Sequence, residues 1–510
     1  MKEGDGSIQL PDTRWKHSRF FDPDPARPGK YYPMKGGFLK DDVFAFDPLF
    51  FGISPRDAES MDPQQRVLME QVYRAFEDAG LRLEDLRGSR TGTFVGAFPI
   101  DNMSQVYIEP NRHLLDSASA TSSMMTMLSN RVSYVFDLRG PSLTVDTACS
   151  ASLVATHQAC RSLRLGECSM AVVGAANIIT RPDCTILLSK GKFVSDYGTC
   201  SAFDESAGGY ARGEGAAALI LKRLSDALND GDRVWGVIRN TGVNHNGKTN
   251  GISEPSYFAQ RQLVEQVYRE AGVSPRSVGY IEAHGTGTQA GDSTEGMVFR
   301  DVFNAARETA HDFKPLPCLV GSIKTNICHT ESVAGIAGII KATLVVHHGY
   351  IPRNLHVKQQ NPKVDFGQYL RLAHNGQAYP TGYDKRRASV NSSGYGGANA
   401  HALVEQAPAL GASVATVTKR LDPPARSSTD AMPYLIPVSA RTMTALAKVA
   451  RSVANLLPAV SKPSSITDLM YTTSMRRSHF ELRGAVIAKT AEEARTRLLQ
   501  LSENTPAEGV

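Results

Sequence analysis

The stretch VDTACSAS, residues 145–152, joins an apolar run to the helix-compatible segment SLVATHQACRSL and places Cys149 at a strand-to-helix turn. A thiol at a helix N-terminus faces unpaired N–H groups and the positive end of the helix dipole, and both favour the nucleophilic thiolate. Small neighbours, Ala148, Ser150 and Ala151, leave room for a substrate. The alternative is a buried cysteine that packs as a small apolar side chain. This stretch alone does not decide between them.

The segments around this turn predict alternating strands and helices. SMAVVGAANII (169–179) and GAAALILKRL (215–224) are typical of buried strands, and FAQRQLVEQVYREAG (258–272) is typical of an amphipathic helix that ends at Gly272. VGYIEAHG and CLVGSIKTN add two transitions from strand to loop. The pattern predicts mixed α/β layers.

Composition excludes several classes of protein. The chain of 510 residues has a net charge of only +5, without a dense Lys/Arg stripe beside aromatic residues, so nucleic-acid binding is not indicated. The start, MKEGDGSIQL, has no apolar core of a secretory signal. The longest apolar run, VAGIAGIIKATLVV (333–346), is short for a membrane span and contains Lys341, so it predicts a buried helix. Seven scattered cysteines without a CxxC pair argue against a disulfide scaffold or a zinc site. We therefore expect a soluble cytoplasmic protein without a metal.

Three zones follow one another along the chain. Residues 1–406 are rich in glycine and alternate strand and helix patterns, and residues 407–433 form a linker rich in Pro, Ala, Ser and Thr. Residues 434–510 combine the strand-like YLIPVSA and GAVIAK with the helical TALAKVARSVANLL and AEEARTRLLQL. This last zone predicts a small α/β domain.

A second chemical constellation is EAHGTGTQAGD (282–292). His284 ends a strand-like run and enters a loop of glycines and threonines. Such a loop can bring the backbone close to a ligand while the hydroxyls of Thr286 and Thr288 form hydrogen bonds. A structural role for a single histidine remains the alternative.

A third constellation is SIKTNICHTESVAG (322–335), which contains Lys324, His329 and Glu331 before an apolar helix. A histidine near a helix N-terminus is favoured as the neutral ring, which can donate a hydrogen bond to a carbonyl that gains negative charge. A capping or core histidine is the alternative. Cys328 beside it suggests a nucleophile and its base, two metal ligands, or mere adjacency. Adjacent residues rarely present their side chains to one point, which disfavours the first two.

Together these segments resemble the β-ketoacyl synthase family, and more closely the ketosynthase domain of fungal iterative type I polyketide synthases of the reducing kind. The resemblance covers roughly residues 15–406. It is carried by DPQQRVLMEQVYRAFEDAG (62–80), DTACSASLVATHQACRSLRLGEC (146–168), FDESAGGYARGEG (203–215), HGTGTQAGD, IKTNICHTESVAGIAGIIKA (323–342) and VNSSGYGGANAHALVE (390–405). Residues 434–510 look like the linker domain between ketosynthase and acyltransferase.

The resemblance implies a thiolase-like α/β fold of five layers, α-β-α-β-α, usually in a homodimer, followed by the small α/β linker domain. Cys149 matches the nucleophile that accepts the acyl chain, and His284 and His329 match the two histidines that promote decarboxylation of malonyl carrier protein. Lys324 matches the lysine that holds the hydrogen-bond network of the site. The remaining matches are supporting residues, Glu331, Thr286 and Thr288, and an oxyanion-hole and gate segment, Tyr395 and Gly396, in which the amides of Cys149 and Tyr395 form the hole.

The same resemblance implies β-ketoacyl synthase chemistry, a decarboxylative Claisen condensation. A thioester on cysteine forms easily and leaves easily, which suits a covalent acyl carrier. Decarboxylation moves negative charge onto a thioester oxygen, so hydrogen-bond donors must be aimed there in advance. No bound cofactor is implied, because an acyl carrier protein delivers acyl and malonyl groups on its phosphopantetheine arm. Acyltransferase and reducing domains are expected elsewhere.

Departures from the family pattern support a second hypothesis. Cys328 stands where the family has glycine, and a position that needs a positive φ would then be strained and would displace His329. Ser393 replaces a phenylalanine near the acyl channel. The chain begins after the family's first core strand, so we expect the first sheet to lack a central member, and no acyltransferase follows residue 510. The alternative is thus a truncated or degenerate remnant that acts as a dimerising or binding module. A Cys–His hydrolase is a third reading, disfavoured because its motifs are absent.

Overall fold

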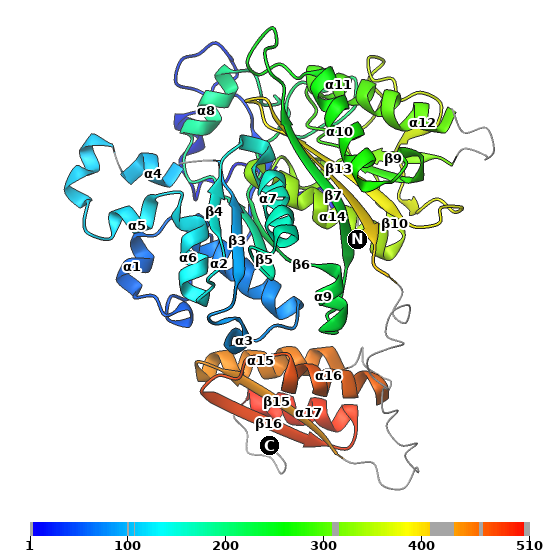
Figure 1. The fold of residues 1–510 in the computed structure, drawn as a ribbon. Coiled ribbons are helices and arrows are strands. Elements are labelled where there is room, and N and C mark those ends of the chain that lie inside the picture. The colour runs from blue at the N-terminus through cyan, green and yellow to red at the C-terminus, as the bar shows by residue number, and fades with distance from the viewer. Residues whose placement is uncertain are drawn as a thin grey trace. The chain divides into compact units, whose positions relative to one another are not determined.

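The computed structural model describes residues 4–98, 101–106, 108–308, 316–408, 433–457 and 463–503. The chain forms two compact units (Figure 1). The first comprises Met1–Val72 and Arg90–Pro408, and the second comprises Tyr73–Ser89 and Ala409–Val510. Residues 409–432 of the predicted linker lie outside the described ranges.

The N-terminal sheet of the first unit has four strands in the order β4-β3-β5-β6. β3 is parallel to β4 and to β5, whereas β6 is antiparallel to β5. The strands are β3 (Thr91–Gly96), β4 (Ser142–Val145), β5 (Met170–Asn177) and β6 (Gly215–Lys222). Both strands predicted here are present, and β5 is buried along its whole length. The prediction of a buried strand is wrong for β6, which is only half-buried because it lies at the edge of the sheet.

The C-terminal sheet has six strands in the order β11-β9-β8-β13-β14-β7. Its segment β9-β8-β13-β14 repeats the order and the strand directions of β4-β3-β5-β6. Its strands are β7 (Gly236–His245), β8 (Tyr280–Glu282), β9 (Cys318–Gly321), β11 (Leu370–Leu372), β13 (Arg387–Ser393) and β14 (Ala398–Gln406). The two halves of the unit are therefore built on one plan.

The comparison of the two sheets corrects one expectation. β14 pairs with β13 on one side and antiparallel with β7 on the other, whereas no described strand pairs with the outer side of β6. A strand that corresponds to β7 would lie beside β6, at the edge of the sheet. The sequence predicts that the N-terminal sheet lacks a central strand. The position that this prediction assigns to the strand is therefore wrong, because the strand would lie at the edge.

Two helices lie between the sheets and contact both of them, α7 (Ala151–Leu165) and α14 (Ala334–His348). On the outer faces, α2 (Pro63–Asp78) and α6 (Met127–Phe136) cover the N-terminal sheet, and α10 (Tyr257–Ala271) and α11 (Gln289–Phe299) cover the C-terminal sheet. This arrangement gives the five layers of the predicted thiolase-like fold. As predicted, α10 ends at Gly272, which has a φ of 63°.

The predicted apolar helix, α14, is buried between the layers. A Cβ on Gly335 would lie only 2.7 Å from Cβ of Leu153 on α7, so glycine permits the two central helices to approach. Lys341 is buried with the helix, and its Nζ lies 2.9 Å from a carboxylate oxygen of Glu282. Pairing with a carboxylate is what allows a lysine to remain in a core.

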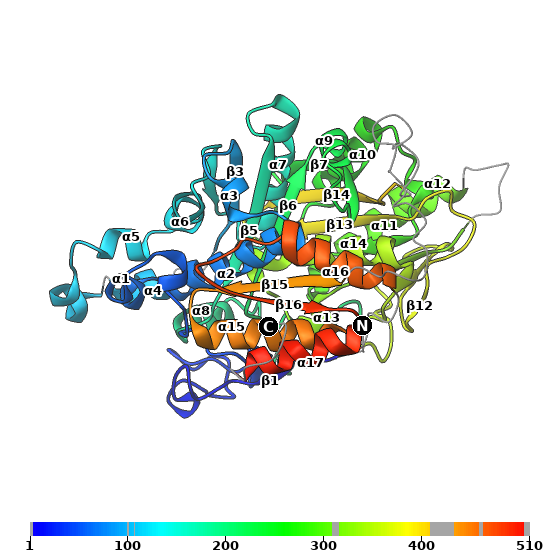
Figure 2. The same cartoon turned by 90° about the horizontal axis from the view of Figure 1, so that it is seen from below.

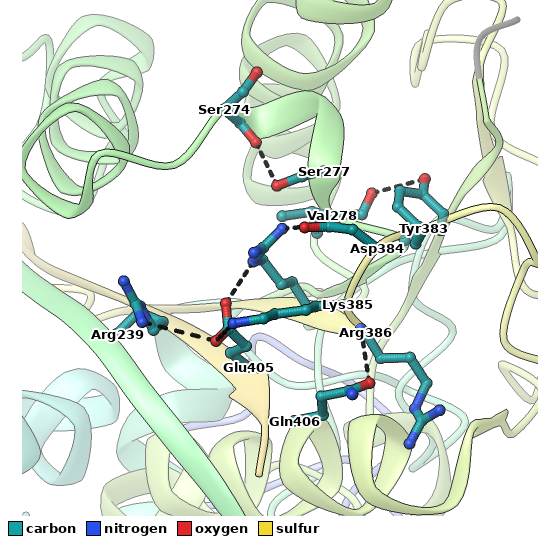
Figure 3. Close-up of polar contacts among 12 residues, drawn as sticks. Arg239, Ser274, Ser277, Val278, Tyr383, Asp384, Lys385, Arg386, Glu405 and Gln406 are labelled. Atoms are coloured by element: carbon teal, nitrogen blue, oxygen red, sulfur yellow. Dashed lines mark hydrogen bonds and ion pairs between the residues drawn. The ribbon is translucent and has the colours of Figure 1, made fainter. Parts of the chain in front are cut away.

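The outer end of the β13–β14 pair is fastened by charged side chains (Figure 3). The carboxylate of Glu405 accepts hydrogen bonds from Arg387 at 2.7 Å and from Lys385 at 3.1 Å, and Arg239 lies 3.7 Å away. Burial would raise the pKa of Glu405, but the hydrogen bonds from Arg387 and Lys385 lower it overall. The strand ends are thus tied together at physiological pH.

Shorter elements complete the first unit. They are β1 (Ser7–Gln9), β2 (Lys35–Gly37), β10 (Tyr350–Ile351), β12 (Gln377–Ala378), α1 (Pro55–Ser60), α4 (Asp101–Val106), α5 (Ser119–Ser123), α8 (Asp183–Lys190), α9 (Leu224–Asn229), α12 (Ala305–Glu308) and α13 (Lys324–Ile327).

The second unit has the strands and helices that its sequence predicts. β15 (Tyr434–Ala440) pairs antiparallel with β16 (Leu482–Ala488). Figure 2 shows α15 (Met443–Leu456) and α17 (Ala491–Ser502) side by side on one face of this pair, and α16 (Pro463–Met475) on the other. The unit also holds the short helix α3 (Leu83–Leu86). Across all described residues, none of the helices has the length and apolar character needed to cross a membrane.

Candidate active site

Cys149 lies where the sequence predicts, at the turn between β4 and α7. The chain leaves β4 at Val145, forms one 3-10 turn over Ala148–Ser150 and enters α7 at Ala151. Ala148 adopts a positive φ of 53° in this turn. The hydroxyl of Ser392, on β13, donates to the carbonyl oxygen of Cys149 at 2.8 Å. The nucleophile candidate is therefore fixed by both halves of the unit.

The surroundings of the Cys149 thiol do not favour the thiolate. Cys149 is only 5% exposed, and burial raises the pKa of its thiol to about 12, with a further contribution from the negative charge of Glu331. Lys324 and the backbone amides of Cys149 and Tyr395 lower the pKa but do not outweigh burial. The expectation of a thiolate is wrong, because loss of hydration exceeds the effect of the helix end.

The two amides that lower this pKa are those predicted to form the oxyanion hole. The amide of Tyr395 and that of Cys149 both donate toward the Cys149 sulfur. Tyr395 belongs to the turn between β13 and β14, and its side chain is 44% exposed beside Phe98 and Phe193. The adjacent Gly396 contributes its carbonyl oxygen, which lies 3.0 Å from Nε2 of His245.

His284 follows the end of β8 in the glycine-rich loop, as predicted. The carboxylate of Glu295 accepts hydrogen bonds from the backbone N–H of His284 at 2.8 Å and of Gly285 at 2.7 Å. Burial and the positive charge of Lys324 lower the pKa of His284 well below its usual value, so the ring is neutral. The hydroxyls of the two threonines that the sequence points to, Thr286 and Thr288, lie 3.1 Å apart and bond to each other.

His329 lies just before the 3-10 turn Glu331–Val333 that leads into α14. Burial lowers the pKa of His329 well below its usual value, and Lys324, His284 and Arg212 lower it further. This agrees with the predicted neutral ring. The backbone N–H of Glu331 donates to Nδ1 of His329 at 3.0 Å. A neutral ring that accepts at Nδ1 must carry its proton on Nε2, so Nε2 is a donor.

The two histidine rings lie together and leave two polar atoms unused. Their centroids are 5.5 Å apart and their planes are nearly perpendicular, at 83°. Within the described part of the chain, Nδ1 of His284 and Nε2 of His329 are buried without a hydrogen-bond partner. Buried polar atoms are nearly always paired in folded proteins. Each of these two atoms is therefore a candidate partner for a polar ligand.

Lys324 and Glu331 lie close to the two rings. Lys324 is buried, which lowers the pKa of its ammonium, while the carboxylates of Glu282 and Glu295 counteract this effect. Glu331 forms a fully buried two-point ion pair with Arg212, at 2.6 and 2.8 Å.

The substituted position, Cys328, is indeed one that favours glycine. Its backbone has a φ of 62° and a ψ of −177°. The side chain packs in an apolar cluster that includes Cys200 and Tyr210. Gly37 and Gly213 make room for it, because a Cβ on either residue would lie about 3.1–3.2 Å from the Cys328 Cβ. The ring of Tyr210 in this cluster packs in turn against that of His329, with centroids 4.7 Å apart.

The sequence missed several residues of this site. Arg212 lies inside the segment 203–215, and Glu295 lies three residues after the segment HGTGTQAGD. Nothing in the neighbouring sequence shows that Arg212 would contact Glu331 or that Glu295 would contact the His284 loop. The only local signal is Asp292 and Glu295 at a spacing of three on α11, which puts two buried carboxylates on one helix face.

Comparison with known proteins agrees with this geometry. The model of the N-terminal domain of β-ketoacyl synthases matches residues 1–227, that of the C-terminal domain matches residues 235–358, and that of the ketoacyl-synthetase C-terminal extension matches residues 361–487. The oxazolomycin ketosynthase domain of Streptomyces albus is 36% identical, with a TM-score of 0.86 over 98% of this chain and 84% of that one. The chain belongs to the β-ketoacyl synthase family.

Further relatives of this ketosynthase come from bacteria and fungi. The ketosynthase from module 6 of the bacillaene synthase of Bacillus subtilis is 31% identical, with a TM-score of 0.86 over 99% of this chain and 82% of that one. A phenolphthiocerol/phthiocerol polyketide synthase of Mycobacterium tuberculosis is 38% identical over 98% of this chain and 31% of its own length. The highly reducing polyketide synthase tstA of Talaromyces stipitatus is 43% identical over 78% of this chain and 15% of its own length.

The ketosynthase spans about a third or less of the length of the curated relatives it matches. The family places it among the condensing transferases of polyketide synthases. The matches include mycobacterial and fungal proteins alike, and so do not by themselves narrow the chain to the fungal branch.

Proposed function

We propose that Cys149 accepts an acyl chain and that the ketosynthase joins this chain to a malonyl unit on an acyl carrier protein, with loss of carbon dioxide. The observation that carries the proposal is the pair of neutral histidine rings, His284 and His329, whose centroids lie 5.5 Å apart and which each hold one buried nitrogen without a partner. Neutral rings that are already in position can donate hydrogen bonds to an oxygen as it gains negative charge, and no proton has to move to solvent beforehand.

The first step transfers the acyl chain. The Cys149 sulfur attacks the thioester carbonyl of the incoming acyl group, and the phosphopantetheine thiol leaves. Because the pKa of Cys149 is raised to about 12, its proton must depart as the attack occurs. The phosphopantetheine thiolate takes up this proton as it leaves, so the exchange of thiols is balanced. The amides of Cys149 and Tyr395 stabilise the oxyanion that forms in between.

The second step breaks the bond between the malonyl carboxylate and the α-carbon. Carbon dioxide leaves, and the electron pair moves onto the thioester oxygen as an enolate. Nε2–H of His329 is a fixed donor, because the Glu331 amide occupies Nδ1. We propose that this donor and His284 hold the enolate oxygen, while Lys324 and the hydroxyls of Thr286 and Thr288 support them.

The third step forms the new carbon–carbon bond. The enolate carbon attacks the carbonyl of the acyl-Cys149 thioester, and the oxyanion of this intermediate again accepts from the amides of Cys149 and Tyr395. Collapse of the intermediate expels the Cys149 thiolate, which takes up one proton from solvent, so that the loss of carbon dioxide from the malonyl carboxylate is balanced. The β-ketoacyl product remains on the carrier protein.

The assembly around this reaction is part of the proposal. We propose a homodimeric ketosynthase of an iterative, reducing polyketide synthase of the fungal type, with Tyr395 and Gly396 as its gate segment and residues 434–510 as the linker domain that precedes an acyltransferase. Similarity to the reducing polyketide synthase DEP5 of Fusarium langsethiae, 39% identical over 97% of this chain, supports this type. Seven cysteines without disulfides support a reducing compartment, the cytoplasm.

Mass spectrometry of the intact chain and of its peptides tests the function. The protein is incubated with a short acyl thioester of N-acetylcysteamine and then with malonyl carrier protein. An acyl adduct on Cys149 that disappears as a β-ketoacyl product forms on the carrier is expected. Product formation with a Cys149→Ala control, or an adduct on Cys328 instead, would contradict the proposal. An acyl adduct released only as free acid would identify a hydrolase, and absence of any adduct would identify an inactive remnant.

A further inference from the structure

The backbone that carries His284 is held by one buried carboxylate. Glu295 accepts from the N–H groups of two successive residues, His284 and Gly285, at 2.8 and 2.7 Å. Gly285 has a positive φ of 41°, so the loop turns sharply at this point. The direction of the His284 ring therefore depends on where the Glu295 carboxylate is fixed.

Glu295 is in turn fixed by a pair of residues on the C-terminal sheet. Nδ2 of Asn391, on β13, lies 3.2 Å from Oε1 of Glu295. Asn391 is the cross-strand partner of His401 on β14, and Oδ1 of Asn391 is hydrogen-bonded to Nδ1 of His401. Nε2 of His401 lies 3.2 Å from the hydroxyl of Ser389.

The chemistry of these groups fixes the direction of every bond in the series. A carboxylate only accepts, so the Asn391 amide must turn its N–H groups to Glu295 and its oxygen to His401. His401 must then donate from Nδ1 and accept at Nε2 from the Ser389 hydroxyl. One tautomer of His401 and one orientation of Asn391 satisfy the whole series.

His401 remains neutral in this position. Its side chain is only 1% exposed, and burial lowers its pKa to about 3. The tautomer therefore stays the same across the physiological pH range. The ring of Tyr268 packs against His401 with centroids 5.8 Å apart and limits its movement.

We propose that His401 and Asn391 are positioning residues for His284, which act through the Glu295 carboxylate. This inference rests on the proposed function, because it assigns to His284 the activation of the malonyl unit. His401 does not touch substrate. It holds the Asn391 amide, the amide holds the carboxylate, and the carboxylate aims the loop so that His284 faces His329.

The two half-reactions should respond differently to loss of this support. Decarboxylation requires His284 and His329 in their mutual geometry, whereas the oxyanion hole for acyl transfer is made by the amides of Cys149 and Tyr395. A displacement of about 1 Å at a reacting group costs roughly a hundredfold in rate. The expected signature is therefore a lower kcat for decarboxylation with an unchanged KM and little change in acylation.

Three variants separate positioning from packing. His401→Phe keeps an aromatic ring but removes the hydrogen bonds, and His401→Gln restores a side-chain N–H donor toward Asn391. Phe303→Leu changes the packing around Tyr268 without touching the series. Release of carbon dioxide from a malonyl thioester of N-acetylcysteamine and acylation of Cys149 are measured for each. We expect decarboxylation to fall about tenfold to a hundredfold in His401→Phe, to recover in His401→Gln, and to stay at the wild-type rate in Phe303→Leu.

A measurement on the resting protein makes the inference independent of turnover. Isotope-labelled histidine side chains are followed by NMR, with His284 assigned through a His284→Gln variant. We expect the His284 ring signals to shift in His401→Phe and in Asn391→Ala, but not in Phe303→Leu. A wild-type protein that neither acylates nor decarboxylates would overturn the proposed function, while the His284 signals would still decide the positioning role.

The inference fails if His401→Phe leaves both the His284 signals and the decarboxylation rate at wild-type values. It fails equally if acylation and decarboxylation fall together and His401→Gln restores neither, because that result indicates general damage to the core. If His401→Phe does not fold, His401→Gln and Asn391→Ala carry the same comparison.

Discussion

The guanidinium of Arg212 and the carboxylate of Glu331 form a two-point ion pair at 2.6 and 2.8 Å, and the amide of the same Glu331 donates to Nδ1 of His329. The side chain and the backbone of one residue therefore link a buried charge pair to the histidine tautomer. Thr185 adds a further bond, since its hydroxyl accepts from Arg212 at 2.9 Å.

Breaking this pair should destabilise the protein strongly. Removing one partner leaves an uncompensated buried charge, which costs roughly 3–5 kcal/mol. We expect Arg212→Met to lower the free energy of unfolding of the first unit by about this amount, as measured by denaturant titration. Arg261→Ala is the matched control, because Arg261 and Glu265 form a half-exposed pair whose loss costs about 0.5 kcal/mol or less. Equal losses in the two variants would contradict the prediction.

Replacing Cys328 with glycine should stabilise the protein. A non-glycine residue in this backbone region costs about 1–3 kcal/mol, and glycine gives back up to about 1 kcal/mol as extra freedom in the unfolded chain. We expect Cys328→Gly to raise the free energy of unfolding by about 1 kcal/mol and to increase the melting temperature. Cys328→Ala keeps the Cβ in the strained position and should show no such gain. A gain of the same size in both variants would point to the thiol instead of the backbone.

The reaction of Cys149 with iodoacetamide should follow the raised pKa of its thiol. Only the thiolate reacts, and burial raises the pKa to about 12. We expect the alkylation rate, measured on the Cys149 peptide by mass spectrometry, to rise about tenfold per pH unit up to at least about pH 9. An unhindered thiol peptide with a pKa near 8.5 is the reference and should level off in that range. A plateau for Cys149 near neutral pH would show that a thiolate–imidazolium pair exists and would contradict our account.

Asp62 should make stability depend on pH in a direction opposite to that of a surface carboxylate. Burial raises its pKa to about 6, above the value of about 3.9 in an unfolded chain. The folded state then binds the proton more tightly, so this contribution is present below about pH 4 and is lost as the pH rises through about 6. Asp62→Asn keeps an oxygen for the Gln64 amide, which now donates at 2.8 Å.

We therefore expect Asp62→Asn to be more stable than the wild type by about 2–3 kcal/mol at pH 7.5 and to lose most of this advantage at pH 4.5. Thermal unfolding of both proteins at the two pH values measures the difference. An advantage of Asp62→Asn that is constant with pH would contradict the assignment.

The sequence predicted those features that depend on local pattern. Residues within one or two turns of chain were enough to predict the turn at Cys149 and the end of α10 at Gly272. They also predicted that His329 lies just before a helix. The state of the Cys149 thiol could not be predicted in this way, because burial by distant layers outweighs the helix end nearby. Arg212 and Glu331 are separated by 119 residues and meet only in the folded core. The half-burial of β6 was missed for the same reason, since its composition resembles that of a central strand.

The edge position of β6 also has a consequence for handling the protein. The strand reads GAAALILK and carries one charge, at its last residue, Lys222. Natural sheets protect their edges with charges, prolines or bulges, because a bare apolar edge is a template for intermolecular pairing. In preparations of this chain, self-association should therefore start at β6 and depend on protein concentration, even where the fold is thermodynamically secure. Colloidal behaviour, more than the melting temperature, should then set the working concentration of the protein.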